Sequence, residues 1–477
     1  MSFVSFTFLF FFVVFISLFH IAARFDKNAV KIQQVLIFLA SVVFYAFADI
    51  KFVPFIAYAI FLSYFAGRLS GMEGRKGKIV FAAFVVADLL PLLFFKYAPS
   101  GWKGQLLFPL GLSFFTFQSL SYIIDCRTKK VEAEKNPFMV ALFISFFPVV
   151  SLGPIQRPGN LIPQLKTAHR FNYENAADGL KIFAWGAFKK FCVADALAVY
   201  VNHVYAPSGL SAQPAPALLL AIVFYSFQLY CDFSGYSDMA IGVSKYMGFD
   251  VGKNFDHPFL AVSVGDFWRR WHISLSTWLR DYVYIPLGGS RVALYRIYAN
   301  LIITFLVSGI WHGSTWNFVI WGLLHGLYQC AGRAAKPVTE KIKTPDFIKI
   351  AVTFCLVSIS LIFFRAETLS DVGMVIQGIA RLPQNIGQFI AIKGQLGFKE
   401  ALRAAFSIEG GFVNMVDRLI TLAVFICASV ATRNKSGLEI IKSKPVAVKW
   451  LAYYALCLLI IYFFNTGLVT NFIYSNF

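Results

Sequence analysis

The sequence predicts an all-α protein that crosses a membrane many times. Of its 477 residues, 58% are hydrophobic and only 14% are charged, whereas soluble domains have roughly 25% charged residues. Apolar runs also cover almost the whole chain. We therefore expect one integral membrane domain over residues 1–477, with N-terminal helices in 1–130, a central core in about 137–335 and C-terminal helices in 346–477.

The apolar runs give the expected helices in order. A helix needs about 17 to 25 residues to cross the hydrocarbon core of a bilayer. A shorter run at 138–153 contains Pro148 and Gly153, which break a helix, so we expect a re-entrant half-helix there. The expected spans lie near residues 3–22, 33–50, 53–67, 79–97, 105–125, 178–203, 214–232, 347–365, 413–431 and 447–465.

The formal net charge is +19, and lysine and arginine gather in short loops between the apolar runs. This is the positive-inside pattern, which places those loops in the cytoplasm. The first run, 3–19, has no basic residue before it, so we expect an uncleaved span with the N-terminus outside. A nucleic-acid surface is the weaker alternative, because none of the clusters lies on a soluble fold. The basic loops are 24–31, 68–78, 127–135, 336–343 and 433–444.

A stretch without any charged residue separates Arg296 from Arg333. As one helix it would rise roughly 54 Å, against about 30 Å of hydrocarbon core, so the chain must fold back. The polar corner at 312–314 predicts the tip of a helical hairpin. His325 then lies roughly 15 Å down the second helix, near the middle of the membrane, on a different face from His312.

The segment from 263 to 289 predicts a different kind of helix. Ser263 followed by Asp266 is a capping box, so a helix should begin here, and Pro286 should end it. One face of this helix carries tryptophans and the opposite face carries arginines, a pattern typical of a helix that lies in the membrane interface. The tryptophans are Trp268, Trp271 and Trp278, and the arginines are Arg269, Arg270 and Arg280.

Two histidines are the candidate catalytic groups. An ionisable side chain inside a membrane is costly and marks a functional site by default. We expect His325 to stay neutral, because desolvation disfavours its charged form, and a neutral imidazole can act as a general base. The alternative is a neutral histidine bonded to a neighbouring helix. His272 is expected to be a second catalytic group, a donor to the substrate, or a cap on another helix.

The charged residues near these histidines have two interpretations each. Arg269, Arg270 and Arg280 can bind the phosphates of a cytosolic donor or the headgroups of lipids. Asp232 and Asp238 can bind a metal or form structural ion pairs, and we favour ion pairs. The sequence has no HExxH or similar metal-ligand spacing, no glycine-rich nucleotide loop and no GxSxG motif.

The chain contains five long motifs, which read FFPVVSLGPIQRP, YCDFSGYSDMAIG, DFWRRWHISLSTWLRDYVYIPLGG, SGIWHGSTWNFVIWGLLHG and FFRAETLSD. These motifs resemble those of the membrane-bound O-acyltransferases, most closely the bacterial alginate O-acetyltransferase branch. Peptidoglycan O-acetylating and teichoic-acid D-alanylating relatives are also similar. The resemblance covers about residues 1–370.

The resemblance implies a ring of about 11–13 transmembrane helices, with re-entrant and interfacial helices, around a central funnel. It also implies that His325, in the WGLLHG motif, is the catalytic histidine and that His272 is a second functional position. The supporting positions are His312, Asn317, Trp321, Asp281 and Asp232, and the positions expected to bind the acyl donor are Trp268, Arg269, Arg270, Trp271 and Arg280.

The implied function is that of a membrane O-acetyltransferase in the bacterial cytoplasmic (inner) membrane. We expect it to move an acetyl group from a cytosolic thioester, acetyl-CoA, for O-acetylation of a wall or surface polysaccharide such as alginate or peptidoglycan. No metal or other cofactor is expected. The expected partner is an exported SGNH-type acetyltransferase, and residues 366–412 are either its docking site or a covering loop. The alternatives are another donor, either a D-alanyl carrier protein or a long-chain acyl-CoA, and a non-enzymatic transporter.

In the expected mechanism, His325 is the base for the acceptor hydroxyl. His272, a nearby tryptophan or backbone N–H groups stabilise the developing oxyanion. A site in the middle of the membrane lets donor and acceptor reach one residue from opposite sides. An acyl-histidine intermediate is the alternative.

Overall fold

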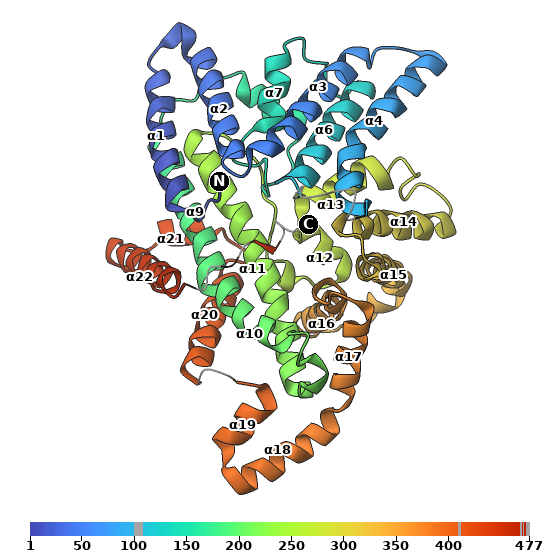
Figure 1. The fold of residues 1–477 in the computed structure, drawn as a ribbon, viewed down its shortest axis with the longest axis vertical. Coiled ribbons are helices and arrows are strands. Elements are labelled where there is room, and N and C mark those ends of the chain that lie inside the picture. Colours follow the sequence, from blue (N-terminus) through green and yellow to red (C-terminus); the bar gives the residue numbers. More distant parts are fainter. Residues whose placement is uncertain (100–107, 409–411, 468–469, 471, 474–477) are drawn as a thin grey trace.

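The computed structural model describes residues 1–99, 108–408, 412–467, 470 and 472–473 (Figure 1). All regular secondary structure in this part of the chain is helical, which confirms the all-α prediction. Eight of the described helices are long and apolar enough to cross a membrane. The expectation of 11–13 crossings stays a prediction.

The helices form an N-terminal bundle, a central group and a C-terminal group (Figure 1). The N-terminal bundle has α1 (Phe6–Ala22), η1 (Asp26–Asn28), α2 (Ala29–Ala46), η2 (Ile50–Phe52), α3 (Val53–Leu69), α4 (Gly74–Tyr97), α6 (Leu112–Arg127), α7 (Pro137–Ser145) and α8 (Pro158–Leu165). The central group has α9 (Tyr173–Phe188), η3 (Lys189–Asp195), α10 (Ala196–Val204), η4 (Leu210–Ala212), α11 (Ala215–Met247), η5 (Pro258–Leu260), α12 (Val264–Arg270), α13 (Ile273–Leu279), η6 (Arg280–Tyr284), α14 (Leu294–His312) and α15 (Trp316–Thr339). The C-terminal group has α16 (Asp346–Arg365), α17 (Leu369–Ala380), α18 (Leu382–Leu396), α19 (Phe398–Phe406), α20 (Phe412–Ala431), α21 (Gly437–Lys442) and α22 (Val446–Asn465).

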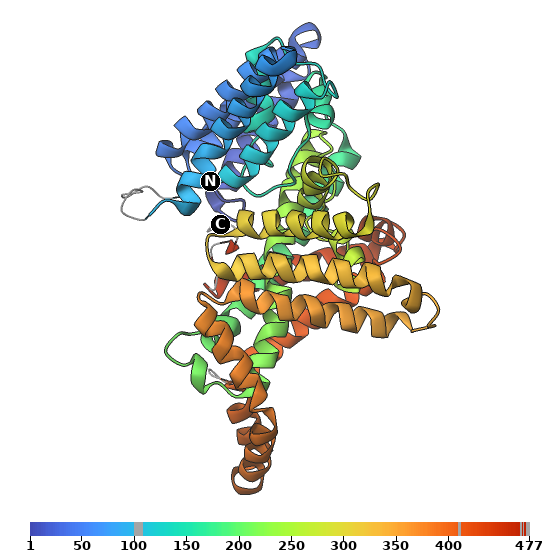
Figure 2. The same ribbon diagram turned by 90° about the vertical axis from the view of Figure 1, so that its right-hand side faces the viewer.

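The hairpin predicted from the charge-free stretch is present. α14 ends at His312 and α15 begins at Trp316, and Figure 2 shows these two helices side by side with α16. A glycine lets α14 and α15 approach closely, because a Cβ atom at Gly322 would lie 2.4 Å from the carbonyl oxygen of Phe305. The close approach fixes the position of α15, and therefore of the histidine one turn further along it.

Replacing Gly322 with valine is expected to destabilise the protein by about 1–3 kcal/mol, because the new side chain collides with backbone of α14. Gly332→Val in the same helix is the matched control, since no atom lies within 4 Å of its Cβ position. Thermal unfolding of both purified variants in detergent measures the difference. Equal unfolding temperatures would contradict this account of the α14–α15 packing.

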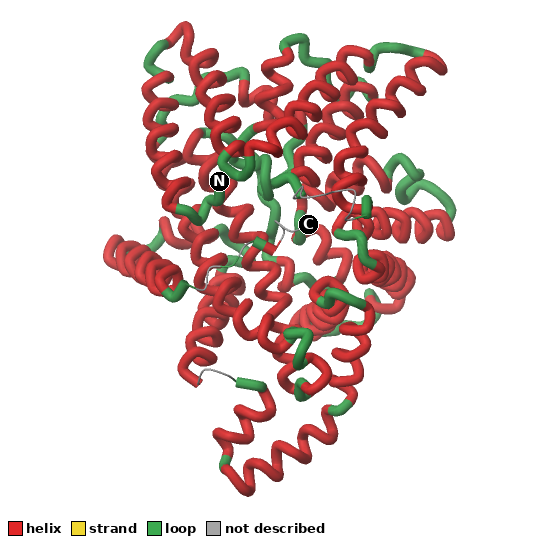
Figure 3. The backbone as a smooth tube through the Cα atoms, in the orientation of Figure 1, coloured by secondary structure: helices red, strands yellow, loops and turns green. Residues whose placement is uncertain are grey.

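A short helix is present where the re-entrant half-helix at 138–153 was expected, and its re-entrant position in the membrane stays a prediction. α7 has nine residues, and the irregular segment that follows it is buried in protein, as backbone without helical hydrogen bonds must be at membrane depth. Figure 3 shows loops gathered in the middle of the molecule, between the N-terminal bundle and the central helices. The expected span at 105–125 falls partly on residues 105–107, which lie outside the described residues, and its described part contains α6.

Helix α11 differs most from the expected spans. The apolar run ends near residue 232, but the helix has 33 residues and continues to Met247. Inside the protein, Asp232 accepts a hydrogen bond from Lys190 at 2.8 Å, and Asp238 pairs with Lys189 at 2.7 Å. Both lysines lie on the π-helical segment η3. Because each carboxylate has a cation beside it there, α11 can continue through both aspartates inside the protein. The structural ion pairs favoured for these two aspartates are therefore present.

The segment expected as a docking site or covering loop is helical. α17 leads away from α16, and α18 and α19 project beyond the rest of the molecule (Figures 1 and 2). α18 has no buried residue, whereas Ala401 and Ala405 of α19 are buried. Residues 409–411 of this segment lie outside the described residues. The projecting part, α18 and α19, is called the arm below.

Candidate active site

His325 lies on α15 with its ring inside the protein, at 1% exposure. Its Nδ1 atom is 3.1 Å from the indole Nε1 of Trp268, and its Nε2 atom is 2.9 Å from the hydroxyl of Ser360 on α16. The Ser360 hydroxyl in turn donates to the carbonyl oxygen of Val357 at 2.6 Å. Both ring nitrogens therefore have hydrogen-bond partners.

These contacts define the tautomer of the His325 ring. An indole N–H can only donate, so Nδ1 must carry the lone pair. The hydroxyl hydrogen of Ser360 is directed at Val357, so Nε2 carries the ring hydrogen and donates it to Ser360. His325 is therefore a neutral imidazole whose lone pair is covered by the Trp268 N–H.

The segment predicted as one interfacial helix forms two short helices inside the protein. α12 begins at Val264, and the Ser263 hydroxyl accepts the Asp266 N–H, so the predicted N-cap is present. The Asp266 carboxylate accepts the N–H of Val262 and not that of Ser263, so the second half of the predicted capping box is not formed. The helix ends at Arg270, and α13 begins at Ile273. The three tryptophans are buried inside the protein, so the prediction of one helix that lies in the membrane interface on its tryptophan face is wrong. Helical periodicity shows that a face is apolar but not whether protein or lipid covers it.

His272 lies at the break between α12 and α13 and has 0% exposure. Its backbone is left-handed, with φ of 43°, a conformation that few non-glycine residues adopt. Its Nδ1 atom is 3.2 Å from Asn254 Oδ1, which also accepts the Ser274 N–H. His272 Nδ1 therefore carries the hydrogen, and Nε2 carries a lone pair that has no hydrogen-bond partner among the described residues. The two candidate histidines are in opposite tautomers.

Trp321 lies against both His325 and His312. Its ring centroid is 4.8 Å from that of His325 and 4.9 Å from that of His312. Trp311 continues this row of rings, at 4.7 Å from His312 and 6.3 Å from His272. The Trp321 indole N–H is buried and has no acceptor within the described part of the chain. Such a donor beside a candidate base is suited to bind a substrate oxygen.

A small cavity of about 10 Å³ borders the His325 ring. Its walls include Phe267, Trp271, Trp321 and Phe364. This volume is close to the roughly 10–15 Å³ that holds one water molecule. A thioester fits into this cavity beside His325 when neighbouring side chains or helices move.

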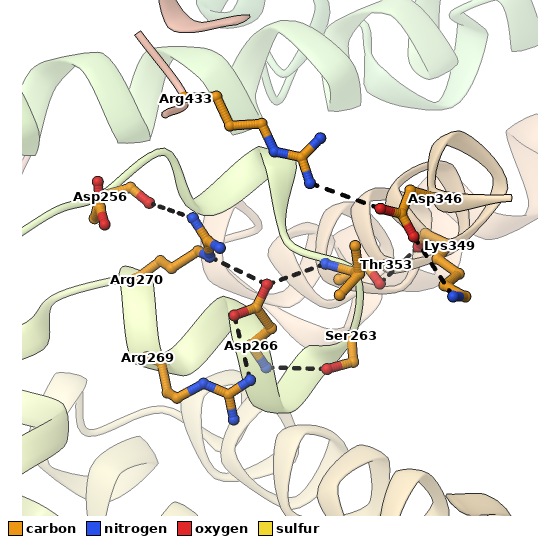
Figure 4. A network of polar contacts seen from close by, with 10 residues as sticks. Asp256, Ser263, Asp266, Arg269, Arg270, Asp346, Lys349, Thr353 and Arg433 are labelled. Atoms are coloured by element: carbon orange, nitrogen blue, oxygen red, sulfur yellow. Dashed lines mark hydrogen bonds and ion pairs between the residues drawn. The ribbon is translucent and has the colours of Figure 1, made fainter. Parts of the chain in front are cut away.

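Two of the arginines expected to bind the donor share one carboxylate. Arg269 and Arg270 pair with Asp266 at 3.3 and 3.1 Å, and Arg270 also donates to the Asp256 carbonyl (Figure 4). Burial alone would raise the pKa of the Asp266 carboxyl, but hydrogen bonds from Arg270 and the Val262 N–H hold it below its ordinary value. One carboxylate between two guanidiniums leaves this edge of α12 positively charged.

Arg280 takes part in another charged group. It pairs with Asp281 at 2.8 Å, and Arg157 lies 3.6 Å from the same carboxylate. The Arg157 guanidinium also lies over the Tyr282 ring, at 4.5 Å from its centroid. The expected donor-binding residues are therefore divided, with Arg269 and Arg270 at Asp266, Arg280 at Asp281, and Trp268 and Trp271 in the interior.

Two of the expected supporting residues have structural partners. The side-chain amide of Asn317 donates to the Ala366 carbonyl at 2.7 Å, which ties the start of α15 to the end of α16. Asp232 lies in a buried group with Lys190 and Asp195. These contacts position helices around the site.

Sequence reasoning missed Ser360, Asn254 and Lys190. A serine in an apolar helix and an asparagine in a loop are common, so a single sequence gives no signal for the first two. Lys190 did have a signal, because it is a charged residue inside the apolar run near 178–203.

Comparisons with known proteins agree on one family. The family model described as "MBOAT, membrane-bound O-acyltransferase family" matches residues 3–370. The chain is 38% identical over 390 residues to the Pseudomonas aeruginosa protein named "Probable alginate O-acetylase AlgI", covering 77% of this chain and 73% of that protein. It is 36% identical over 386 residues to the peptidoglycan O-acetyltransferase of Helicobacter pylori, covering 72% and 73%. It is 29% identical over 329 residues to the teichoic acid D-alanyltransferase of Bacillus subtilis, covering 63% and 82%.

Proposed function

The chain belongs to the membrane-bound O-acyltransferase family, and we propose that it transfers an acetyl group from cytosolic acetyl-CoA to a hydroxyl on the other side of the membrane. The similarity to named alginate and peptidoglycan O-acetyltransferases supports a polysaccharide as the final acceptor. The observation that carries the proposal is the hydrogen bonding of His325, whose Nδ1 lone pair faces an N–H group that an acceptor hydroxyl can replace.

In the proposed reaction, the acceptor hydroxyl takes the place of the Trp268 indole at Nδ1 of His325. The hydroxyl proton passes to Nδ1 while the oxygen attacks the thioester carbonyl carbon. Ser360 accepts the Nε2–H throughout and so stabilises the charged ring. When the tetrahedral intermediate collapses, the C–S bond breaks, the ester forms, and the proton on Nδ1 passes to the CoA thiolate. His325 thereby returns to its starting tautomer.

His272 has a narrower proposed role than the sequence suggests. A group that assists the carbonyl must donate a hydrogen, but Nε2 of neutral His272 carries a lone pair. We therefore assign His272 the role of accepting a hydrogen bond from a substrate N–H or O–H. We assign to Trp321 the role of donating a hydrogen bond to the thioester carbonyl oxygen, because its indole N–H is buried without an acceptor among the described residues.

Trp321→Phe is expected to lower kcat by about 10- to 100-fold, because hydrogen bonds to charged groups contribute about 1.5–3 kcal/mol. The KM for the donor should change little, since the oxyanion exists only in the transition state. Steady-state rates in proteoliposomes measure both constants. Trp450→Phe, at an exposed position on α22, is the matched control, and equal rates for the two variants would exclude Trp321 as the donor.

Charge and exposure support the sites that we propose for the donor and for the partner. The positive edge at Arg269 and Arg270 is proposed to bind the phosphates of CoA. The arm is proposed to dock an exported SGNH-type acetyltransferase, which passes the acetyl group to the polysaccharide. The basic loops support an orientation in the bacterial inner membrane with the N-terminus outside.

Purified protein in proteoliposomes, supplied with one labelled donor at a time, tests the proposed reaction. The donors are acetyl-CoA, a D-alanyl carrier protein and a long-chain acyl-CoA. Label should reach the acceptor from acetyl-CoA alone. Transfer from the D-alanyl carrier, which the similarity to a teichoic acid D-alanyltransferase makes the second candidate, would overturn the donor assignment.

A further inference from the structure

A second cavity, of about 260 Å³, lies outside the active site between α11, η5, α16 and α20. Its volume approaches the roughly 300–1,000 Å³ of typical ligand pockets. The side chains that line it have no polar group apart from those of Tyr230, His257 and Ser429. We call this cavity the lateral pocket. Its volume and lining suit an apolar ligand with few polar groups.

The lateral pocket opens toward the membrane. Phe347 on α16 and Ile426 on α20 both line it, yet they are 71% and 38% exposed. Both helices are candidate membrane spans. In a bilayer, an opening between exposed apolar side chains on two such helices meets lipid chains.

The rim of the lateral pocket is positively charged. Arg433, just after α20, pairs with Asp346 at 3.9 Å, and Lys349 pairs with the same carboxylate at 3.5 Å. Figure 4 shows Arg433 and Lys349 on two sides of Asp346, which begins α16. Asp346 is next in sequence to Phe347, which lines the lateral pocket. One carboxylate between two cations leaves a net positive charge, which attracts an anionic headgroup.

We propose that the lateral pocket binds one acyl chain of an anionic phospholipid, with the headgroup at Arg433 and Lys349. An alkyl chain fills the cavity and gains dispersion contacts without burying a polar group. The pantetheine arm of CoA is a poorer fit, because its two amides would need hydrogen-bond partners that this lining mostly lacks. The charge of the rim then selects an anionic over a zwitterionic lipid.

The bound chain would also support the active site. Phe259, which lines the lateral pocket, has its ring centroid 6.3 Å from that of Phe267 and 6.2 Å from that of Trp271. Phe267 and Trp271 in turn line the small cavity beside His325. A filled lateral pocket therefore holds one wall of that cavity in place. This consequence rests on the proposed function, and we expect acetyl transfer to be faster in membranes that contain the anionic lipid.

The test measures lipid retained by the full-length protein after purification from nanodiscs made of equal parts of phosphatidylcholine and phosphatidylglycerol. Native mass spectrometry should show retained phosphatidylglycerol on the wild type. Ala351→Trp fills the lateral pocket and should remove the lipid, whereas Val352→Trp, at the next and non-lining position, should keep it. Arg433→Ala should lower the preference for phosphatidylglycerol about fivefold, the factor equivalent to about 1 kcal/mol per basic residue at a membrane surface. Lys435→Ala, in the same basic loop, should leave the preference unchanged.

Equal retention by Ala351→Trp and Val352→Trp would overturn the proposal, as would a wild type without preference for phosphatidylglycerol. Native mass spectrometry that shows the wild type bound to another protein and to no lipid would also overturn it. If Ala351→Trp fails to fold, the surface variant Arg433→Ala still decides the headgroup assignment. Lipid retention is read without any acyl transfer, so a protein that retains lipid but transfers no acetyl group in any lipid mixture counts against the proposed function alone.

Discussion

Replacing His325 with alanine is expected to lower acetyl transfer by about 10²- to 10⁴-fold, the range that a positioned general base contributes. The loss should appear in kcat, because the imidazole acts on the reacting hydroxyl and the arginines at Asp266 are proposed to hold the donor. Initial rates of CoA release and of label transfer, at equal protein in proteoliposomes, measure the effect.

Replacing His325 with glutamine distinguishes a catalytic role of the ring from a structural one. Its amide oxygen can accept the Trp268 N–H and its amide nitrogen can donate to Ser360, so both hydrogen bonds can form without a basic nitrogen. His325→Gln should therefore unfold at the wild-type temperature yet lose activity as fully as His325→Ala. His20→Ala, in α1, is the control histidine outside the site. Near wild-type transfer by His325→Gln would mean that the ring has only a structural role.

Replacing Lys190 with methionine is expected to destabilise the protein by about 3–5 kcal/mol, the effect of breaking a buried ion pair from one side. The Lys190 side chain has 0% exposure and lies 2.9 Å from Asp195 and 2.8 Å from Asp232. Methionine has a similar shape but leaves two carboxylates buried without a cation. Thermal unfolding in detergent measures the loss.

Two further variants test whether the loss of stability comes from the unpaired buried carboxylates. Arg269→Met removes a cation whose side chain is 72% exposed, so it should cost less than about 1 kcal/mol. The triple variant Lys190→Met, Asp195→Asn, Asp232→Asn removes all three charges and should recover part of the lost stability. A Lys190→Met protein as stable as Arg269→Met would contradict a structural role for the cluster.

The sequence was sufficient to predict those features of the fold that depend on a single segment of the chain. The hairpin follows from the length of a charge-free stretch, and its tip from the polar corner at 312–314, because both concern how far a helix can continue in a bilayer. The N-cap at Ser263 is equally local. The half-helix at 138–153 follows from the prolines and glycine that interrupt it.

The predictions that were wrong, and the contacts that were missed, depend on which other segments pack against the segment in question. The tryptophan stripe on α12 and α13 has the same periodicity whether lipid or protein covers it, so only the tertiary structure could place it inside. The predicted end near residue 232 was wrong, because α11 continues through Asp232 and Asp238. These carboxylates pair with Lys190 and Lys189 on another element, which the local sequence does not show. Ser360 meets His325 across 35 positions of sequence, and no local pattern records such a contact.

The buried cluster at Lys190 also imposes an order on biogenesis. Two of its hydrogen bonds come from much later in the chain, where the Thr470 hydroxyl donates to Asp195 at 2.6 Å and the Ile473 N–H donates to Asp232 at 2.8 Å. The ribosome delivers the central helices to the translocon long before it synthesises these two donors. A nascent chain halted before Thr470 would therefore have its central helices inserted while Asp195 and Asp232 each lack one hydrogen-bond donor. We expect the quality-control proteases of the membrane to recognise such a chain as incomplete.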